Sequence, residues 1–176
     1  MIKEKDAFFN DGRLIKVDNA ILENIKNEAK MRNKGRFRLC LHHSAQDELH
    51  EMIIVRNKDD YCRPDKHLYT TESQTIIDGA MLVILFEDNG DIQEVFELSK
   101  ESYCTYRIDK DNFHMQIPIT EQVVYYETRQ GPYTEKSNVY PEWAPQPEDE
   151  DDVKRYIIEL KQKIKYLMPE FAEKLS

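Results

Sequence analysis

Two histidines and two carboxylates have the residue types and spacing best suited to chemistry. Asp65 and His67 lie two positions apart, so on a β-strand both side chains project from one face. Glu72 follows five positions later, and a turn through residues 68–71 would let it enter the next strand facing the same interior. A curled sheet can bring His114, on a later strand, opposite these residues. Two imidazoles and two carboxylates suit Fe(II), Mn(II), Zn(II) or Ni(II), so the sequence predicts a divalent metal site.

Polar side chains on the same strands are predicted to line a pocket around this site. The predicted lining residues are Arg63, Gln74, Gln116, Tyr125 and Glu127. Arg63 shares a face with Asp65 by alternation, and it could hold the carboxylate or phosphate of a ligand or simply neutralise Asp65 and Glu72. Tyr125 and Glu127 also share a face and are the candidates for moving a proton. The alternative for each lining residue is a solvated side chain or one paired across strands.

Short segments rich in β-branched and aromatic residues fill the middle of the chain and predict a sandwich or barrel. The predicted strands are Arg36–Leu41, Glu51–Arg56, Glu72–Ile77, Ala80–Glu87, Ile92–Leu98, Tyr103–Ile108, Phe113–Ile119 and Gln122–Thr128. Turn-forming residues separate them, and Asp78-Gly79 is predicted to make a tight hairpin. The run Met81–Phe86 is apolar at every position, so we expect cover on both faces, from the interior and from a helix or a partner chain.

One helix is predicted on each side of the strand region. Residues 18–34 have the apolar spacing of an amphipathic helix, with Asp18 or Asn19 as its N-cap. A second helix is predicted to begin near Glu148 or Asp149, where acidic residues complement the helix dipole. The expected single domain has three segments: an N-terminal helical segment packed on the barrel (1–35), the barrel (36–135) and a C-terminal extended segment with its helix (136–176).

Composition limits the classes of partner. Asp and Glu outnumber Lys and Arg by 34 to 25, giving a net charge of −9 over 176 residues. Such a surface repels phosphate backbones, so neither nucleic acid nor an anionic membrane is an expected partner. No apolar stretch approaches the roughly 20 residues of a membrane helix, and the charged first residues lack the apolar core of a signal peptide. Three cysteines without a CxxC motif indicate reduced thiols, so we expect a cytoplasmic protein.

The apolar surface also bears on assembly. The apolar strand Met81–Phe86 and the two helices offer more apolar surface than one small barrel face needs. We therefore expect a homodimer with a two-fold axis, unless the helices cover their own barrel completely.

The spacing of the candidate ligands resembles a known family. Asp65-x-His67-x4-Glu72-x6-Gly79, followed on a later strand by His114, resembles the two metal motifs of cupins. The chain after Gly35 is similar to the WbuC-type cupin-fold metalloproteins. The supporting residues are Arg36 to His42, Arg63-Pro64, Glu72-Ser73, Phe113-His114, Glu127, Gly131 to Tyr133 and Trp143 to Pro145. One position departs, because cupins have a histidine where this chain has Asp65, and a carboxylate binds soft metals less well.

The resemblance implies an all-β core with flanking helices, that is, a cupin jelly-roll β-barrel with a helix at each end and a bound divalent metal. It also implies a role in bacterial surface-polysaccharide (O-antigen) synthesis, with a sugar or nucleotide-sugar ligand and isomerase or epimerase chemistry. The alternative is a non-catalytic cupin with a degenerate metal site that binds a sugar or other metabolite or has a structural role. A stoichiometric metal favours the enzyme, whereas metal-free protein with a tight ligand favours the binding module.

Overall fold

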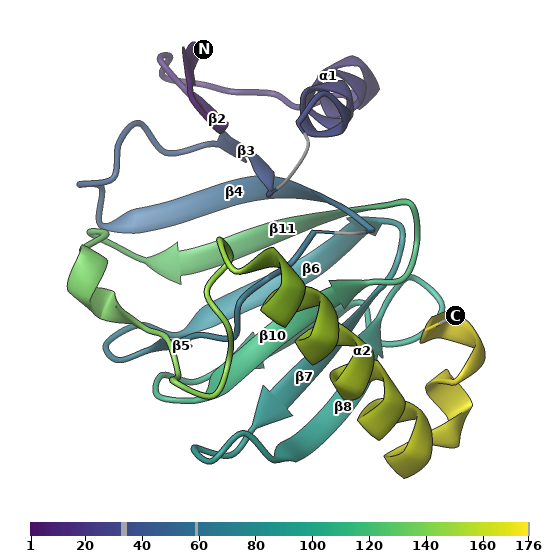
Figure 1. Ribbon diagram of the computed structural model, residues 1–176. Coiled ribbons are helices and arrows are strands. Elements are labelled where there is room, and N and C mark those ends of the chain that lie inside the picture. The colour runs from purple at the N-terminus through teal and green to yellow at the C-terminus, as the bar shows by residue number, and fades with distance from the viewer. Residues whose placement is uncertain (33–34, 59, 176) are drawn as a thin grey trace.

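The computed structural model describes residues 1–32, 35–58 and 60–175 (Figure 1). The strands are β1 (Ile2–Glu4), β2 (Ala7–Phe9), β3 (Phe37–Cys40), β4 (Leu49–Asn57), β5 (Lys66–His67), β6 (Glu72–Asp78), β7 (Met81–Phe86), β8 (Ile92–Leu98), β9 (Thr105–Ile108), β10 (Phe113–Pro118), β11 (Gln122–Gln130) and β12 (Asn138–Val139). The α-helices are α1 (Asn19–Lys30) and α2 (Glu150–Leu167), and short 3-10 helices occupy Glu135–Ser137, Pro169–Phe171 and Glu173–Leu175. Every strand predicted from the sequence is present, and β1, β2, β5 and β12 are additional.

The strands form open sheets instead of the predicted closed jelly-roll barrel. The larger sheet has the order β1-β2-β3-β4-β11-β6-β9, the smaller one has β10-β7-β8, and β12 pairs with β5. Between the sheet edges, the described residues form isolated bridges, Asp65 with His114 and Leu98 with Tyr103, and no ladder that would close a barrel. The barrel prediction is therefore corrected, because the chain passes between the sheets at loops and not along continuous hydrogen-bonded strands.

One of these passages is Asp78-Gly79, and the predicted hairpin there is wrong. β6 belongs to the larger sheet and β7 to the smaller, so the dipeptide turns a corner between sheets. Gly79 has φ +76°, and a Cβ at this position would lie 2.3 Å from the Gln122 carbonyl oxygen, so the corner requires glycine. A true hairpin joins β7 to β8 through residues 87–91, where the sequence also indicates a turn.

The apolar strand β7 is buried on both faces, as its sequence predicts. Its inward side chains, among them Met81 and Val83, belong to the core between the sheets, together with Ile54 and Tyr125. Its outward side chains, among them Leu82 and Ile84, belong to a second core, together with Leu160 and Ile164. Leu160 and Ile164 come from α2, so this helix supplies the cover for the smaller sheet (Figure 1).

Helix α1 lies on the outer face of the larger sheet (Figure 1). Its N-cap is Asp18, whose Oδ1 accepts a hydrogen bond from the Ile21 amide at 3.0 Å. Ile25 and Ala29 are fully buried against the sheet. The helix ends at Lys30, short of the predicted end, and predicted helical residues 33 and 34 lie outside the described part. In the part of the chain that the structure describes, no helix is long and apolar enough to cross a membrane.

The N-terminal residues add strands that the sequence did not indicate. β2 runs parallel to β3 and extends the larger sheet, and β1 pairs with β2 at its edge. The division of the chain into three segments stays a prediction.

The inner faces of the sheets carry polar side chains beside the apolar core. On β6, Ile76 belongs to the apolar core, whereas Gln74 and Glu72 border a cavity. On β4, Ile54 is likewise in the core, and Arg56 borders the cavity. The fold therefore separates an apolar core, which stabilises it, from a polar cavity that can hold a ligand.

Candidate metal centre

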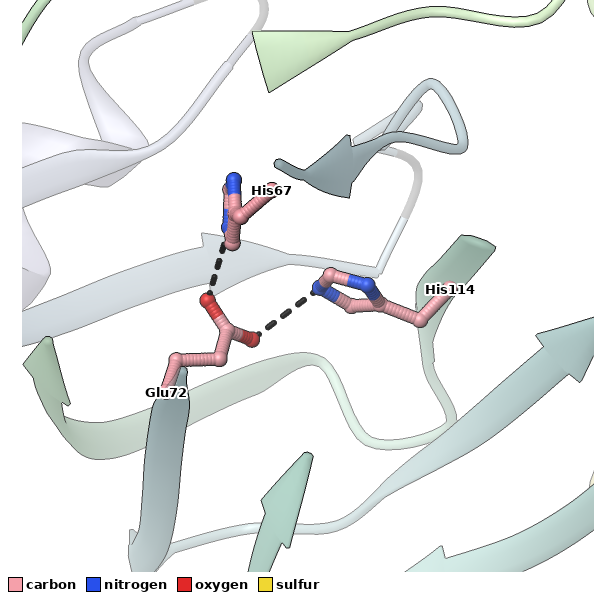
Figure 2. Close-up of side chains that lie close together, drawn as sticks. All are labelled: His67, Glu72 and His114. Atoms are coloured by element: carbon pink, nitrogen blue, oxygen red, sulfur yellow. Dashed lines mark hydrogen bonds and ion pairs between the residues drawn. The ribbon is translucent and has the colours of Figure 1, made fainter. Parts of the chain in front are cut away.

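His67, Glu72 and His114 converge at this cavity from β5, β6 and β10 (Figure 2). The Nε2 atom of His67 lies 3.0 Å from Glu72 Oε2, and Nε2 of His114 lies 3.0 Å from Glu72 Oε1. All three residues are buried, with 5 % exposure or less, and their potential ligand atoms lie within 4.8 Å of one another. The structure thus brings together three of the four residues predicted to bind a metal.

Hydrogen bonds on the far side of each ring fix the orientation of both imidazoles. His114 Nδ1 lies 3.1 Å from the carbonyl oxygen of Asn112, and His67 Nδ1 lies 3.1 Å from Oδ1 of Asn138. Since these oxygens only accept hydrogen bonds, each Nδ1 carries a proton and each Nε2 points at Glu72. A histidine that binds a metal through Nε2 is held in the same way.

The fourth predicted ligand, Asp65, lies on the other side of His67. Its Oδ2 accepts a hydrogen bond of 2.8 Å from Asn138 Nδ2 and lies 3.9 Å from His67 Nδ1. Asp65 is therefore placed to orient Asn138, and through it His67, instead of facing the ligand cluster. Asn138, brought beside His67 by the pairing of β12 with β5, holds the Asp65 carboxylate there.

The buried charges of the cluster stabilise one another. Burial alone would raise the pKa of Glu72, but the His114 and His67 imidazoles outweigh it and hold the pKa far below its usual range. Burial alone would lower the pKa of His114, but the Glu72 carboxylate raises it to about 10. Without a metal, the stable state is an ionised Glu72 beside a protonated His114. A divalent cation would take the place of that proton.

A second carboxylate is linked to the cluster through Gln74. The Gln74 amide donates hydrogen bonds to Glu72 Oε1 at 3.1 Å and to Glu127 Oε2 at 3.0 Å. Burial and the nearby Glu72 charge raise the pKa of Glu127. Glu127 therefore retains a proton more readily than an ordinary glutamate, which is the property of a general acid.

The other predicted lining residues border a cavity of about 480 Å³ that also contains the cluster. Tyr125 OH accepts a hydrogen bond from Arg56 Nε at 3.1 Å, and Gln116 Oε1 lies 3.1 Å from Cys62 Sγ. Burial, opposed by Arg56, raises the pKa of Tyr125 to about 12. Its phenol therefore stays protonated and suits hydrogen bonding better than proton abstraction.

Arg63 lines the cavity, but its guanidinium is already engaged. Its Nη atoms donate to Gln146 Oε1 at 2.7 Å, to the Pro141 carbonyl at 2.9 Å and to the Ala144 carbonyl at 3.1 Å. It also lies over the Tyr140 ring, 5.1 Å from the centroid. These contacts attach the segment before α2 to the sheets, so they do not place Arg63 on Asp65 or Glu72, as one alternative supposed.

Sequence reasoning missed several residues of the cavity. The lining includes Arg36, Arg56, Cys62 and Asn138. Alternation along β4 could have identified Arg56, because it lies two positions beyond Ile54, which faces the core. No local pattern could have identified Asn138, which reaches His67 only because β12 pairs with β5.

Comparisons with known proteins agree with this fold. The family model for a domain of unknown function, DUF6016, matches residues 17–98, and no curated protein matches the sequence. Protein SO0799 from Shewanella oneidensis superposes with a TM-score of 0.54 at 7 % identity, over 72 % of this chain and 85 % of that one.

Two larger proteins match less of the chain. CapF, a capsular polysaccharide assembling protein from Staphylococcus aureus, gives a TM-score of 0.49 at 12 % identity, over 61 % of this chain and 31 % of its own. Oxalate decarboxylase from Bacillus subtilis, whose Mn(II) centres have been characterised, gives a TM-score of 0.43 at 16 % identity. The match covers 53 % of this chain and 24 % of oxalate decarboxylase. The structural neighbours are cupin-fold proteins. The chain spans only about a fifth to a third of the first such neighbours.

Proposed function

We propose that His67, Glu72 and His114 bind one divalent metal ion in a cavity that takes a small, polar, carbohydrate-related molecule. The observation that carries the proposal is that two imidazole Nε2 atoms and one carboxylate, all buried, face one another while both Nδ1 atoms are held by oxygen acceptors. Nitrogen and oxygen donors of this kind suit Fe(II), Mn(II), Zn(II) and Ni(II). Three protein ligands also leave positions for water or a ligand oxygen, as catalytic sites require.

In this proposal the chain acts as a metal-dependent enzyme on a sugar or nucleotide-sugar, with isomerase- or epimerase-like chemistry. The ion would supply Lewis-acid polarisation of a ligand carbonyl or hydroxyl. Glu127, with its raised pKa, would deliver a proton, and Tyr125 would donate a hydrogen bond to the ligand. Gln74 would hold Glu127 at a fixed distance from Glu72.

One observation favours the alternative, a non-catalytic cupin with a degenerate site. Asp65 stands where cupins have a histidine, and its carboxylate is bonded to Asn138 instead of facing the cluster. The cluster then has one ligand fewer, and Glu72 satisfies both Nε2 atoms without an ion. Such a protein would bind the sugar or another metabolite through the cavity lining alone.

The resemblance to WbuC-type proteins extends the proposal to the cellular role. We propose a part in surface-polysaccharide synthesis in the cytoplasm, with the protein acting as a homodimer. Exposed apolar side chains on α2, among them Ile158 and Tyr166, support a self-association surface.

Metal content tests the proposed function. Protein loaded separately with Mn(II), Fe(II), Zn(II) or Ni(II), and then freed of excess ion by gel filtration, is expected to retain one ion per chain by elemental analysis. The preferred ion should raise the melting temperature, because it binds only the folded state. Protein that retains none of the four ions contradicts the metal centre, and tight binding of a sugar by that metal-free protein would support the alternative.

Replacing Asn138 by alanine is expected to weaken metal binding about 10- to 100-fold, although Asn138 does not touch the ion. The change removes the acceptor that holds Nδ1 of His67, so the ring can rotate away from Glu72. Competition titration with a fluorescent chelator measures the affinity. Asn89→Ala, in the exposed β7–β8 turn, is the matched control and should keep wild-type affinity. Equal affinity of Asn138→Ala and wild type would rule out the orienting role.

A further inference from the structure

A buried arginine borders the same cavity as the candidate metal centre. Arg56 is 4 % exposed and borders the cavity. Its Nε donates to Tyr125 OH at 3.1 Å, and its Nη2 lies 3.2 Å from Cys62 Sγ. These contacts are to a hydroxyl and a thiol, and within the described ranges no carboxylate oxygen forms an ion pair with this guanidinium. A buried charge of this kind is costly unless an anion accompanies it.

A second arginine lies beside the first. Arg36 directly precedes β3, and extending the register of Phe37 with Val55 by one residue would set Arg36 opposite Arg56. The two guanidinium groups repel each other, and Arg36 also interacts with Tyr125 and Glu127. Arg36 remains exposed to solvent at the cavity. Two like charges are thus brought together at the wall of a cavity in a chain with a net charge of −9.

Two carboxylates act on this pair, Asp60 on Arg56 and Glu127 on Arg36, and among the described residues neither forms an ion pair with it. Asp60 attracts Arg56 at longer range, and its two oxygens accept hydrogen bonds from the Gly35 and Asn57 amides. Glu127 accepts a hydrogen bond from Gln74. Arg63, the residue that the sequence suggested for anion binding, is engaged by main-chain carbonyls. The cation pair therefore has room for an anion from outside the protein.

We infer that Arg36 and Arg56 form an oxyanion subsite that binds the carboxylate or phosphate of a small ligand whose other oxygens reach His67, Glu72 and His114. Arginine binds both groups through paired N–H donors. The cavity, at about 480 Å³, has the size of a small-molecule site. This inference rests on the proposed function, and it narrows the ligand from a polar molecule to an acidic one, such as a sugar acid or a sugar phosphate.

The test titrates inorganic phosphate and acetate, at constant ionic strength, into isotopically labelled protein followed by NMR. Metal-free protein is used, because phosphate would also bind a metal ion. We expect saturable shifts in wild type, and at least about tenfold weaker binding in Arg36→Gln and Arg56→Met. Arg107→Gln, which loses an exposed pair with Asp109, is the control and should bind as wild type does. The anion that binds more tightly identifies the ligand as a phosphate or a carboxylate.

Two results would overturn the subsite: no saturable binding of either anion to wild type, or wild-type affinity in Arg36→Gln. Arg36→Gln decides the question if Arg56→Met fails to fold, since Arg36 is exposed and not part of the core. The outcome is independent of the metal. Arginine-dependent binding in a protein that retains no ion would refute the metal centre alone, whereas a stoichiometric ion without arginine-dependent binding would refute the subsite alone.

Discussion

Replacing His114 by alanine is expected to lower the affinity for a divalent metal by more than about 100-fold. Loss of an outer partner of a metal ligand already costs about 10- to 100-fold, and this change removes a ligand itself. Glu72 and His67 alone leave too few donors for a stable site. Elemental analysis after gel filtration, together with chelator competition, measures the loss.

The same variant is expected to remain folded. His114 belongs to none of the three apolar clusters that form the core. The far- and near-ultraviolet circular dichroism of His114→Ala should therefore match that of wild type. His43→Ala is the matched control, because His43 is exposed and its Nδ1 lies 2.9 Å from the Asn10 carbonyl oxygen, away from the cluster. Retention of a stoichiometric ion by His114→Ala would refute the site, and an unfolded variant would show that the fold depends on the cluster.

The second large effect is the pH dependence of stability in metal-free protein. Glu72 raises the pKa of His114 from 6.5 to about 10, so the stabilisation it brings is complete below pH 6.5 and is lost as the pH rises toward 10. The pKa of Glu72 is lowered from 4.5, so its contribution is complete above pH 4.5 and is lost as the pH falls below that value. We expect maximal stability between these limits and a decrease of a few kcal/mol by pH 10.

Urea denaturation of metal-free protein at a series of pH values measures this dependence. Glu72→Gln keeps the size of the side chain but removes its charge, so the decrease between pH 6.5 and 10 should largely disappear. Asp109→Asn is the matched control, since it removes an exposed carboxylate whose ion pair with Arg107 contributes little to stability. A pH profile of Glu72→Gln that follows wild type would show that the His114 pair does not govern the pH dependence.

Much of the fold follows from local pattern. Alternation and turn residues predict β3, β4 and β6 to β11. An apolar side chain at every second residue is buried on one face only if the segment is a β-strand. The same rule places Glu72, His67 and His114 toward one interior. The cap at Asp18 and the double burial of Met81–Phe86 are likewise local properties, the first of a helix start and the second of an uninterrupted apolar run.

The tertiary structure alone decided what these elements do together. Whether Asp78-Gly79 makes a hairpin or a corner between sheets depended on which sheet β7 joined. Long-range pairing with β10 decides that. Asp65 and Asn138 are far apart in sequence, so neither the turn of Asp65 away from the cluster nor its bond to Asn138 could be predicted from spacing.

The arginines illustrate the same limit. Strand alternation placed Arg63 at the cavity, but its guanidinium donates hydrogen bonds to the carbonyls of Pro141 and Ala144. Arg36 and Arg56, by contrast, lie close enough to repel each other and border the cavity. Sequence spacing determines which face of a strand a side chain occupies. Which groups it meets there depends on where distant segments pack, because that choice reflects the burial of the whole core and not of any one strand.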